Sequence, residues 1–315
     1  MRVIVACLLV PFLLSAQSLD DGKREFGKGN IAGAKKIFEQ VLSADDRNAE
    51  AHYQLGLVYL GRQFRDDDEA VDQMEKAVDL NPNSADYQYG YGAALGMKTQ
   101  NAGVFKQAFL APKVKSAFLK ATELNPAHVQ AHLALAQYYL RAPGIMGGDT
   151  EKGWQEVETA IKLDEYLGRM TKSRLLQSEK RLPEAENELK TLTSSMPRDW
   201  RVWKSIGYFY YQQKRNDDAA AAMNRYVALR PDTADSHKSL AEVQLQNGDA
   251  DAALASLKKA LLLDKDFVTA VYLLGKTYEA KGMKNEARES YRRVLELNPG
   301  DNLRKLAEQN LKDLS

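Results

Sequence analysis

Cysteine and histidine are scarce in this 315-residue chain, which contains one cysteine, Cys7, and four histidines. A single thiol near the start excludes an internal disulfide, a zinc–thiolate site and a thiol nucleophile from residues 8–315. The sequence also lacks a His-Glu-x-x-His zinc motif, a Gly-x-Ser-x-Gly nucleophile motif, a phosphate-binding loop and a dinucleotide fingerprint. We therefore predict a non-enzymatic protein that requires neither a metal nor a cofactor.

An excess of charge of one sign is missing as well, because 44 lysines and arginines face 43 aspartates and glutamates. A neutral chain has no general attraction to nucleic acid or to an anionic membrane, which argues against both as main partners. Beyond the first residues, no apolar run approaches the roughly 20 residues that span a bilayer. The mature chain is therefore expected to contain no membrane span.

The N-terminal segment has the features of an export signal. Arg2 precedes an apolar run over residues 3–14, and the small residues Ser15 and Ala16 follow it. This order is typical of a secretory signal peptide, here residues 1–16 with cleavage after Ala16. We expect an exported protein in the periplasm of a bacterium or associated with its outer membrane. An uncleaved N-terminal anchor and lipidation of Cys7 remain alternatives.

A 34-residue period organises the second half of the chain. Three series of small or apolar residues show it: Ala219, Ala253 and Ala287; Gly207, Ala241 and Gly275; and Tyr226, Ala260 and Val294. Gly248 and Gly282 mark the turn between two helices in successive periods. A constant period of this length indicates a stack of helix–turn–helix repeats.

The pattern resembles the tetratricopeptide repeat family, which has Leu-Gly at positions 7–8, Tyr at 11, Ala at 20, an aromatic residue at 24, Ala at 27 and Pro at 32. Segment 200–233 matches it with Trp203, Ile206-Gly207, Tyr210, Ala219, Met223, Tyr226 and Pro231. The same pattern divides the chain into eight units, 15–48, 49–84, 85–128, 129–165, 166–199, 200–233, 234–267 and 268–301. Residues 302–315 are expected to form a closing amphipathic helix.

The residue types explain why such units would stack. Small residues at positions 8 and 20 let two helices approach closely, and the apolar positions fill the space to the next unit. The family resemblance implies an all-α, right-handed superhelical solenoid over residues 17–301, without independent domains. Two departures stand out. Lys172-Ser173 replace Leu-Gly in unit 166–199, and an insertion near 98–110 could form either a longer helix or a loop.

The remaining polar motifs are interpreted mainly as structural. His52, His132 and His237 occupy position 4 of their units, which is a packing position. His128 and His132 lie four residues apart, a spacing that could bind zinc, but no acidic third ligand stands at a matching offset. The acidic residues 66–69 are expected to cap a helix. The 143–149 loop is either a long turn, with Asp149 or Thr150 capping the next helix, or an exposed contact for a partner.

The resemblance also implies a binding surface, because in this family the first helix of each unit lines a concave groove. The predicted groove residues are Tyr53, Tyr89, Arg174, Arg201, Lys204, Tyr208, Tyr211, Lys238, Tyr272 and Lys276. Tyrosine combined with arginine or lysine is common in binding hot spots. The cations near position 204 suit a peptide with acidic groups or a free C-terminal carboxylate. The asparagines of the family's two-carboxylate clamp are absent.

These observations predict a protein–protein interaction scaffold that binds a peptide or helix of an envelope client. One alternative is an assembly or secretion cofactor docked to an outer-membrane or pilus complex. Another is a homo-oligomer that associates through the apolar ends of the solenoid.

Overall fold

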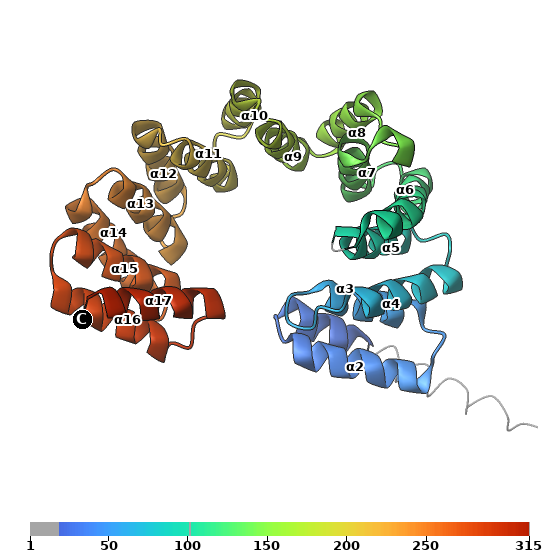
Figure 1. Ribbon diagram of the computed structural model, residues 1–315, viewed down its shortest axis with the longest axis horizontal. Helices are drawn as coiled ribbons and strands as arrows, with labels where there is room; N and C mark the ends of the chain where they lie inside the picture. The colour runs from blue at the N-terminus through green and yellow to red at the C-terminus, as the bar shows by residue number, and fades with distance from the viewer. Residues whose placement is uncertain (1–18, 101, 315) are drawn as a thin grey trace, which may run out of the picture. The chain divides into compact units, whose positions relative to one another are not determined.

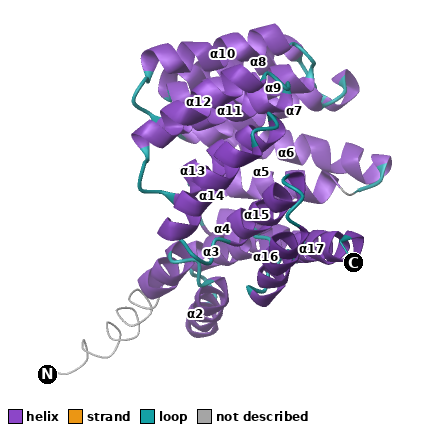
Figure 2. Ribbon diagram, turned by 90° about the vertical axis from the view of Figure 1, so that its left-hand side faces the viewer, coloured by secondary structure: helices purple, strands orange, loops and turns teal. Residues whose placement is uncertain are grey.

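The computed structural model describes residues 19–100 and 102–314, and the proposed signal segment 1–16 lies outside them. Within these two ranges every regular element is a helix and no strand occurs. Figure 1 shows the helices in chain order, and Figure 2 shows the loops that join them. The predicted all-α class is therefore confirmed. No described helix is both long enough and apolar enough to cross a bilayer.

The helices follow one another with short connections. Residues 19–27 are helical, and the elements after them are α2 (Ile31–Ala44), α3 (Ala49–Leu60), α4 (Asp67–Leu80), α5 (Ala85–Gln100), α6 (Val104–Leu124), α7 (Val129–Arg141), the 3₁₀ turn η1 (Gly144–Met146), α8 (Thr150–Leu163), α9 (Glu165–Ser178), α10 (Leu182–Ser195), α11 (Trp200–Gln212), α12 (Asn216–Leu229), α13 (Ala234–Gln246), α14 (Ala250–Leu263), α15 (Val268–Ala280), α16 (Lys284–Glu296) and α17 (Asp301–Asp313). Each helix packs against the next, from α2 to α8 and again from α10 to α17.

Polar side chains at the repeat boundaries start many of these helices. Asn30, Asn48 and Asp249 each accept a hydrogen bond from the backbone N–H three residues later. Asp66 accepts from the first turn of α4, and Asp149 accepts from the Lys152 N–H of α8 at 3.1 Å. Such caps satisfy backbone donors that a helix leaves unpaired at its start. The structural interpretation of the acidic segment 66–69 and of Asp149 is confirmed.

The small residues of the repeat pattern lie where paired helices touch. Ala219, Ala253 and Ala287 are completely buried. A Cβ placed on Gly275 of α15 would lie 2.6 Å from the Tyr291 ring of α16, well inside van der Waals contact. Gly207 faces Met223 in the same way, at 2.9 Å. The recurring glycine thus makes room for the large residue of the second helix, as the family pattern requires.

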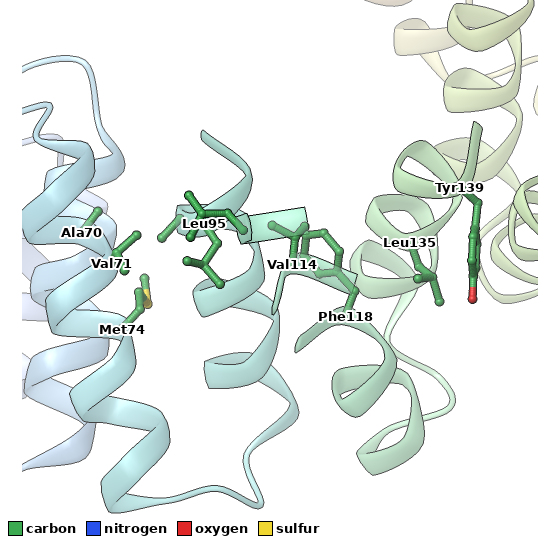
Figure 3. Close-up of a cluster of buried hydrophobic side chains, with 10 residues drawn as sticks. Ala70, Val71, Met74, Leu95, Val114, Phe118, Leu135 and Tyr139 are labelled. Atoms are coloured by element: carbon green, nitrogen blue, oxygen red, sulfur yellow. The ribbon is translucent and has the colours of Figure 1, made fainter. Parts of the chain in front are cut away.

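The chain divides into two compact units, one ending at Thr171 and the other beginning at Lys172, inside α9. Figure 3 shows the core of the first unit, where Met74 of α4, Leu95 of α5, Phe118 of α6 and Leu135 of α7 form one buried cluster.

The second unit contains further clusters of its own. One lies between α13, α14 and α15, and another joins α15 and α16 to α17, where Ala307 of the closing helix is fully buried.

The two departures from the repeat pattern have clear structural outcomes. The 98–110 insertion lengthens the helices on both sides of the turn, because α5 continues to Gln100 and α6 begins at Val104. In unit 166–199, Ser173 replaces the usual glycine and is fully buried. Its hydroxyl donates to the Ala185 carbonyl at 3.0 Å, so it fastens α9 to α10 by a hydrogen bond.

Candidate functional site

The first helices of two successive repeats, α11 and α13, are joined by partly buried polar side chains. Lys204 of α11 donates to the Asp235 carboxylate of α13 at 2.6 Å, and Tyr226 donates to the same carboxylate at 2.7 Å. Burial alone would raise the pKa of Asp235, but the hydrogen bonds from Lys204 and Tyr226 outweigh it and lower the pKa. The carboxylate therefore stays ionised and holds the two helices together.

A second bridge lies one turn farther along α11. The Tyr208 hydroxyl donates to Glu242 at 3.1 Å, and the Lys238 ammonium lies 3.2 Å from that hydroxyl and 3.1 Å from the Glu242 carboxylate. Burial disfavours the charged form of Lys238, but Tyr208 and Glu242 outweigh this effect and raise the pKa of the lysine. Burial also raises the pKa of Tyr208. The raised pKa values keep the Tyr208 phenol protonated and Lys238 charged at neutral pH.

Beside this second bridge lies a groove of about 840 Å³. It is lined by Tyr211 of α11, by Lys238, Glu242, Leu245 and Gln246 of α13, by Thr269, Tyr272, Leu273, Lys276, Glu279 and Ala280 of α15, and by Leu303 of α17. Four of the predicted groove residues thus share one cavity. The sequence brings them together because positions 5, 9 and 12 of a repeat's first helix, which these four residues occupy, face the same side in each unit.

The groove is a mainly apolar surface with one available cation. Tyr211, Tyr272 and Leu273 are partly exposed and provide aromatic and aliphatic area. Lys238 is occupied by Glu242, whereas Lys276 is exposed and forms no ion pair or hydrogen bond with any described residue. Glu279 accepts a long hydrogen bond of 3.4 Å from Asn310 of α17. An apolar ligand carrying an anionic group would fit this arrangement.

Two of the other predicted cations, Arg201 and Lys204, have acidic partners. Arg201 folds back onto Asp199, the cap of its own helix, through its Nε at 3.0 Å. Lys204 is paired with Asp235, as described above. Arg174 lies exposed on α9. Arg201, Lys204 and Lys238 therefore each have a counter-ion, and Lys276 is the groove lysine left for a ligand.

The two predicted residues of the first unit contribute to packing between helices. The Tyr53 ring of α3 lies 5.0 Å from the Tyr87 ring of α5, and burial raises the pKa of Tyr53 to about 12. The Tyr89 ring lies 6.1 Å from Phe118 and 5.0 Å from the His128 imidazole. Both tyrosines pack against the hydrophobic core of that unit.

The histidines at position 4 have a shared structural role. The Nε2 atoms of His52, His132 and His237 lie 2.8–2.9 Å from the backbone carbonyl six residues earlier, in the linker between repeats. Trp203 donates its indole N–H to the Pro197 carbonyl in the same way, at 2.9 Å. All three histidines are buried, so their interpretation as packing residues is confirmed. No group of three or more potential metal ligands lies among the residues that the structure describes.

The pairing of Lys204 and Lys238 with the carboxylates of Asp235 and Glu242 was not predicted from the sequence. A usable signal exists, since Lys204 and Asp235 lie 31 residues apart and Tyr208 and Glu242 lie 34 apart. Residues separated by about one repeat lie on adjacent first helices, so charges at such offsets can be tested for pairing.

The sequence is similar to large curated proteins. It is 26% identical over 283 residues to Tetratricopeptide repeat protein 37 of Xenopus laevis, with 87% of this chain and 17% of that protein covered. Superkiller complex protein 3 of Mus musculus is 24% identical over 276 residues, with 85% and 17% covered. The chain therefore spans about a sixth of the length of these relatives.

The fold is similar to the crystal structure of a tetratricopeptide repeat protein from Parabacteroides merdae, with a TM-score of 0.53 and 12% identity, over 95% of this chain and 98% of the other. Family models described as tetratricopeptide repeats match residues 19–85, 171–234 and 244–309, which together make up more than half of the chain. The chain belongs to the tetratricopeptide repeat family.

Proposed function

We propose that this protein is an interaction scaffold whose groove between α11, α13, α15 and α17 binds a segment of a protein partner. The observation that carries this proposal is a single cavity in which Tyr211, Tyr272 and Leu273 surround the unpaired Lys276. Its volume of about 840 Å³ lies within the usual range for ligand sites, about 300–1,000 Å³. Rigid aromatic side chains lose little entropy on binding and dominate many protein interfaces.

The lining also defines the chemistry of the partner segment. Apolar side chains of the partner would pack against Tyr211, Tyr272 and Leu273. A carboxylate, from an acidic residue or from a chain end, would pair with Lys276. The segment would be a short helix or an extended peptide, since both are common occupants of grooves between helices. The Lys204–Asp235 pair joins α11 to α13, and Lys238 is paired with Glu242 within α13, so neither lysine is left for an acidic ligand.

The location of the protein is part of the proposal. The pattern of residues 1–16 supports export, with a client in the bacterial cell envelope. Docking to an outer-membrane or pilus assembly is one form that such a client could take, and a second copy of the chain is another. Edman sequencing of protein recovered from a periplasmic extract tests the localisation. An N-terminus at Gln17 would support it, and an intact Met1 in cytoplasmic protein would contradict it.

The binding claim can be tested with a displayed peptide library, which requires no identified client. Peptides selected on the full chain are measured by fluorescence polarisation against Tyr272→Ala, Lys276→Glu and a control variant, Lys258→Glu. Lys258 is exposed on α14, a second helix that does not line the groove. The control thus makes the same charge change elsewhere in the second unit.

We expect Tyr272→Ala to weaken binding by roughly 30-fold, because a central aromatic contact contributes about 2 kcal/mol or more. Lys276→Glu should weaken acidic peptides most, and this loss should shrink at high salt. The control should bind like the parent. Equal affinity of all four proteins for every selected peptide would contradict a site in this groove.

A further inference from the structure

The balanced net charge of the chain conceals a long segment without acidic residues. Residues 87–122, which include most of α5 and α6, contain five lysines, Lys98, Lys106, Lys113, Lys115 and Lys120, and neither an aspartate nor a glutamate. The hairpin formed by these two helices is also the longest in the described chain, because the insertion extends both helices.

This end of the hairpin exposes large apolar side chains. Phe105 is 95% exposed, Val104 is 71% exposed and Phe109 is 69% exposed. Successive residues of an α-helix are rotated by about 100°, so residues 105, 109 and 112 share one face. Pro112, the third of them, is exposed as well. The first turns of α6 therefore present an apolar stripe to solvent, while Leu110 and Val114 on the opposite face enter the core.

The turn η1 carries another exposed apolar side chain of this unit. It packs against α6, and Lys115 reaches the Gly147 carbonyl at 3.5 Å. Ile145 in this turn is 95% exposed. The surface formed by Val104, Phe105 and Phe109 is called the hairpin tip below.

Two lysines beside the stripe have no acidic partner. Lys98 is paired with Asp68 of α4 at 2.6 Å, and Lys120 lies 3.5 Å from Glu123. Lys106 and Lys113 are exposed and form no ion pair with a described residue. The Lys113 ammonium lies 5.8 Å from the centre of the Phe109 ring. Cations thus flank the exposed phenylalanines. The Asp68 carboxylate of α4, which also attracts Lys106, is paired with Lys98.

We propose that the hairpin tip binds the surface of an anionic phospholipid membrane. Phe105 and Phe109 enter the boundary between headgroups and acyl chains, and Lys106 and Lys113 contact the lipid phosphates. Helices that lie at membrane interfaces combine an apolar face carrying phenylalanine with flanking lysines in this way. Each lysine near an anionic bilayer strengthens binding by about fivefold.

A lipid surface explains this composition better than a protein partner does. Protein–protein interfaces are depleted in lysine and enriched in arginine and tryptophan, whereas every cation of the segment 87–122 is a lysine and the segment contains no tryptophan. The proposal concerns a surface contact of one hairpin. It is independent of the groove in the second unit, because the tip and the groove share no residue.

The test places a fluorescent probe at the tip of the full chain. Phe105→Trp is compared with Leu262→Trp, which carries its probe at a leucine that is 86% exposed on α14. Each variant is mixed with vesicles of phosphatidylcholine alone or with 40% phosphatidylglycerol, and emission and quenching by brominated lipids are recorded against the parent protein. Because the probe reports its own position, apolar residues elsewhere in the chain do not produce the signal.

With anionic vesicles, we expect the tryptophan of Phe105→Trp to shift to shorter wavelength and to be quenched, while that of Leu262→Trp is unchanged. Adding Lys106→Gln and Lys113→Gln should weaken the response roughly 25-fold, as two losses of about fivefold require. A probe that stays in water on both vesicle types overturns the proposal. An equal response to neutral vesicles also overturns it. In a separate sample with an acidic peptide in place of vesicles, a response to the peptide alone overturns it as well.

Discussion

Gly275 is the position where a single methyl group should disturb the packing of two paired helices. A Cβ added there would lie 2.6 Å from Cε1 and 2.9 Å from Cδ1 and Cζ of Tyr291. Carbon atoms prefer separations of about 3.5–4.0 Å, so the ring would have to move by roughly 1 Å. Tyr291 cannot do this freely, since it is fully buried and its hydroxyl accepts a hydrogen bond of 3.1 Å from Asn310.

The expected free-energy change combines two opposing effects. Inserting a methyl group into a packed core costs about 1–3 kcal/mol, and replacing glycine by alanine within a helix gains about 1 kcal/mol. The two effects together leave a net loss of about 0–2 kcal/mol. We expect Gly275→Ala to lower the free energy of unfolding by about 1–2 kcal/mol, in the upper half of that range, because the Tyr291 ring is confined. Gly207→Ala should be close to neutral, since the flexible Met223 side chain can adjust. Gly96→Ala, with no atom within 4 Å, should stabilise α5 by about 0.5–1 kcal/mol.

Urea unfolding followed by circular dichroism, together with hydrogen exchange of α15 and α16, measures these changes. Local exchange is informative because stability in a repeat array is approximately a sum of local contributions. The double variant Gly275→Ala/Tyr291→Leu should lose less than the sum of its single variants, which identifies the contact as the cause. The reasoning is refuted if Gly275→Ala is as stable as the parent while Gly96→Ala behaves as expected.

Two further predictions concern the first unit. The hydrogen bond that the His132 ring donates to the Glu156 carboxylate raises the pKa of His132 despite burial. This stabilisation is present below the unfolded pKa of about 6.5 and is lost as pH rises through the folded value. His132→Gln should therefore lower the free energy of unfolding more at pH 6 than at pH 9, and the two losses should differ by about 1–2 kcal/mol, as expected for a charged hydrogen bond. Calorimetry that shows an equal loss of stability at both pH values would contradict this. Gly168→Ala should lower the free energy of unfolding by about 3 kcal/mol or more. Its Cβ would lie 2.5 Å from the Ile161 Cα, a backbone atom that cannot move away as a flexible side chain can. A urea unfolding midpoint equal to that of the parent protein would exclude this contact.

The repeat pattern predicts the fold well because each of its positions encodes a local packing requirement. Gly275 and Tyr291 are 16 residues apart in sequence, and any helical pair of this length brings them together. Asp66 and Asp149 could be identified as caps because a capping side chain acts on the turn that directly follows it. The 98–110 insertion could not be assigned, since an addition of this size is compatible with a longer helix or a loop. Because the insertion lengthens two helices and does not form a loop, Phe105 lies in the first turn of α6, and its exposure could not be predicted without that result.

The candidate site was predicted in part, and the limit is again physical. Tyr211, Tyr272 and Lys276 could be placed on one face from their repeat positions. The sequence does not show which lysines remain available to a ligand. Lys204 and Lys276 are both predicted groove lysines, yet Asp235 is paired with the first, while the second has no ion pair or hydrogen bond among the described residues. Availability depends on how neighbouring first helices are rotated, which is a property of the three-dimensional packing.

The most direct test of the binding account is the position at which a bound peptide can be captured. A photoreactive benzoylphenylalanine is introduced in place of Tyr272 within the groove, or in place of Lys258 on α14 as a control, and each full chain is irradiated with a library-selected peptide. The account predicts a covalent adduct from position 272 that excess unlabelled peptide abolishes, and none from position 258. Adducts at position 258, with none at position 272, would contradict a binding groove between α11, α13 and α15.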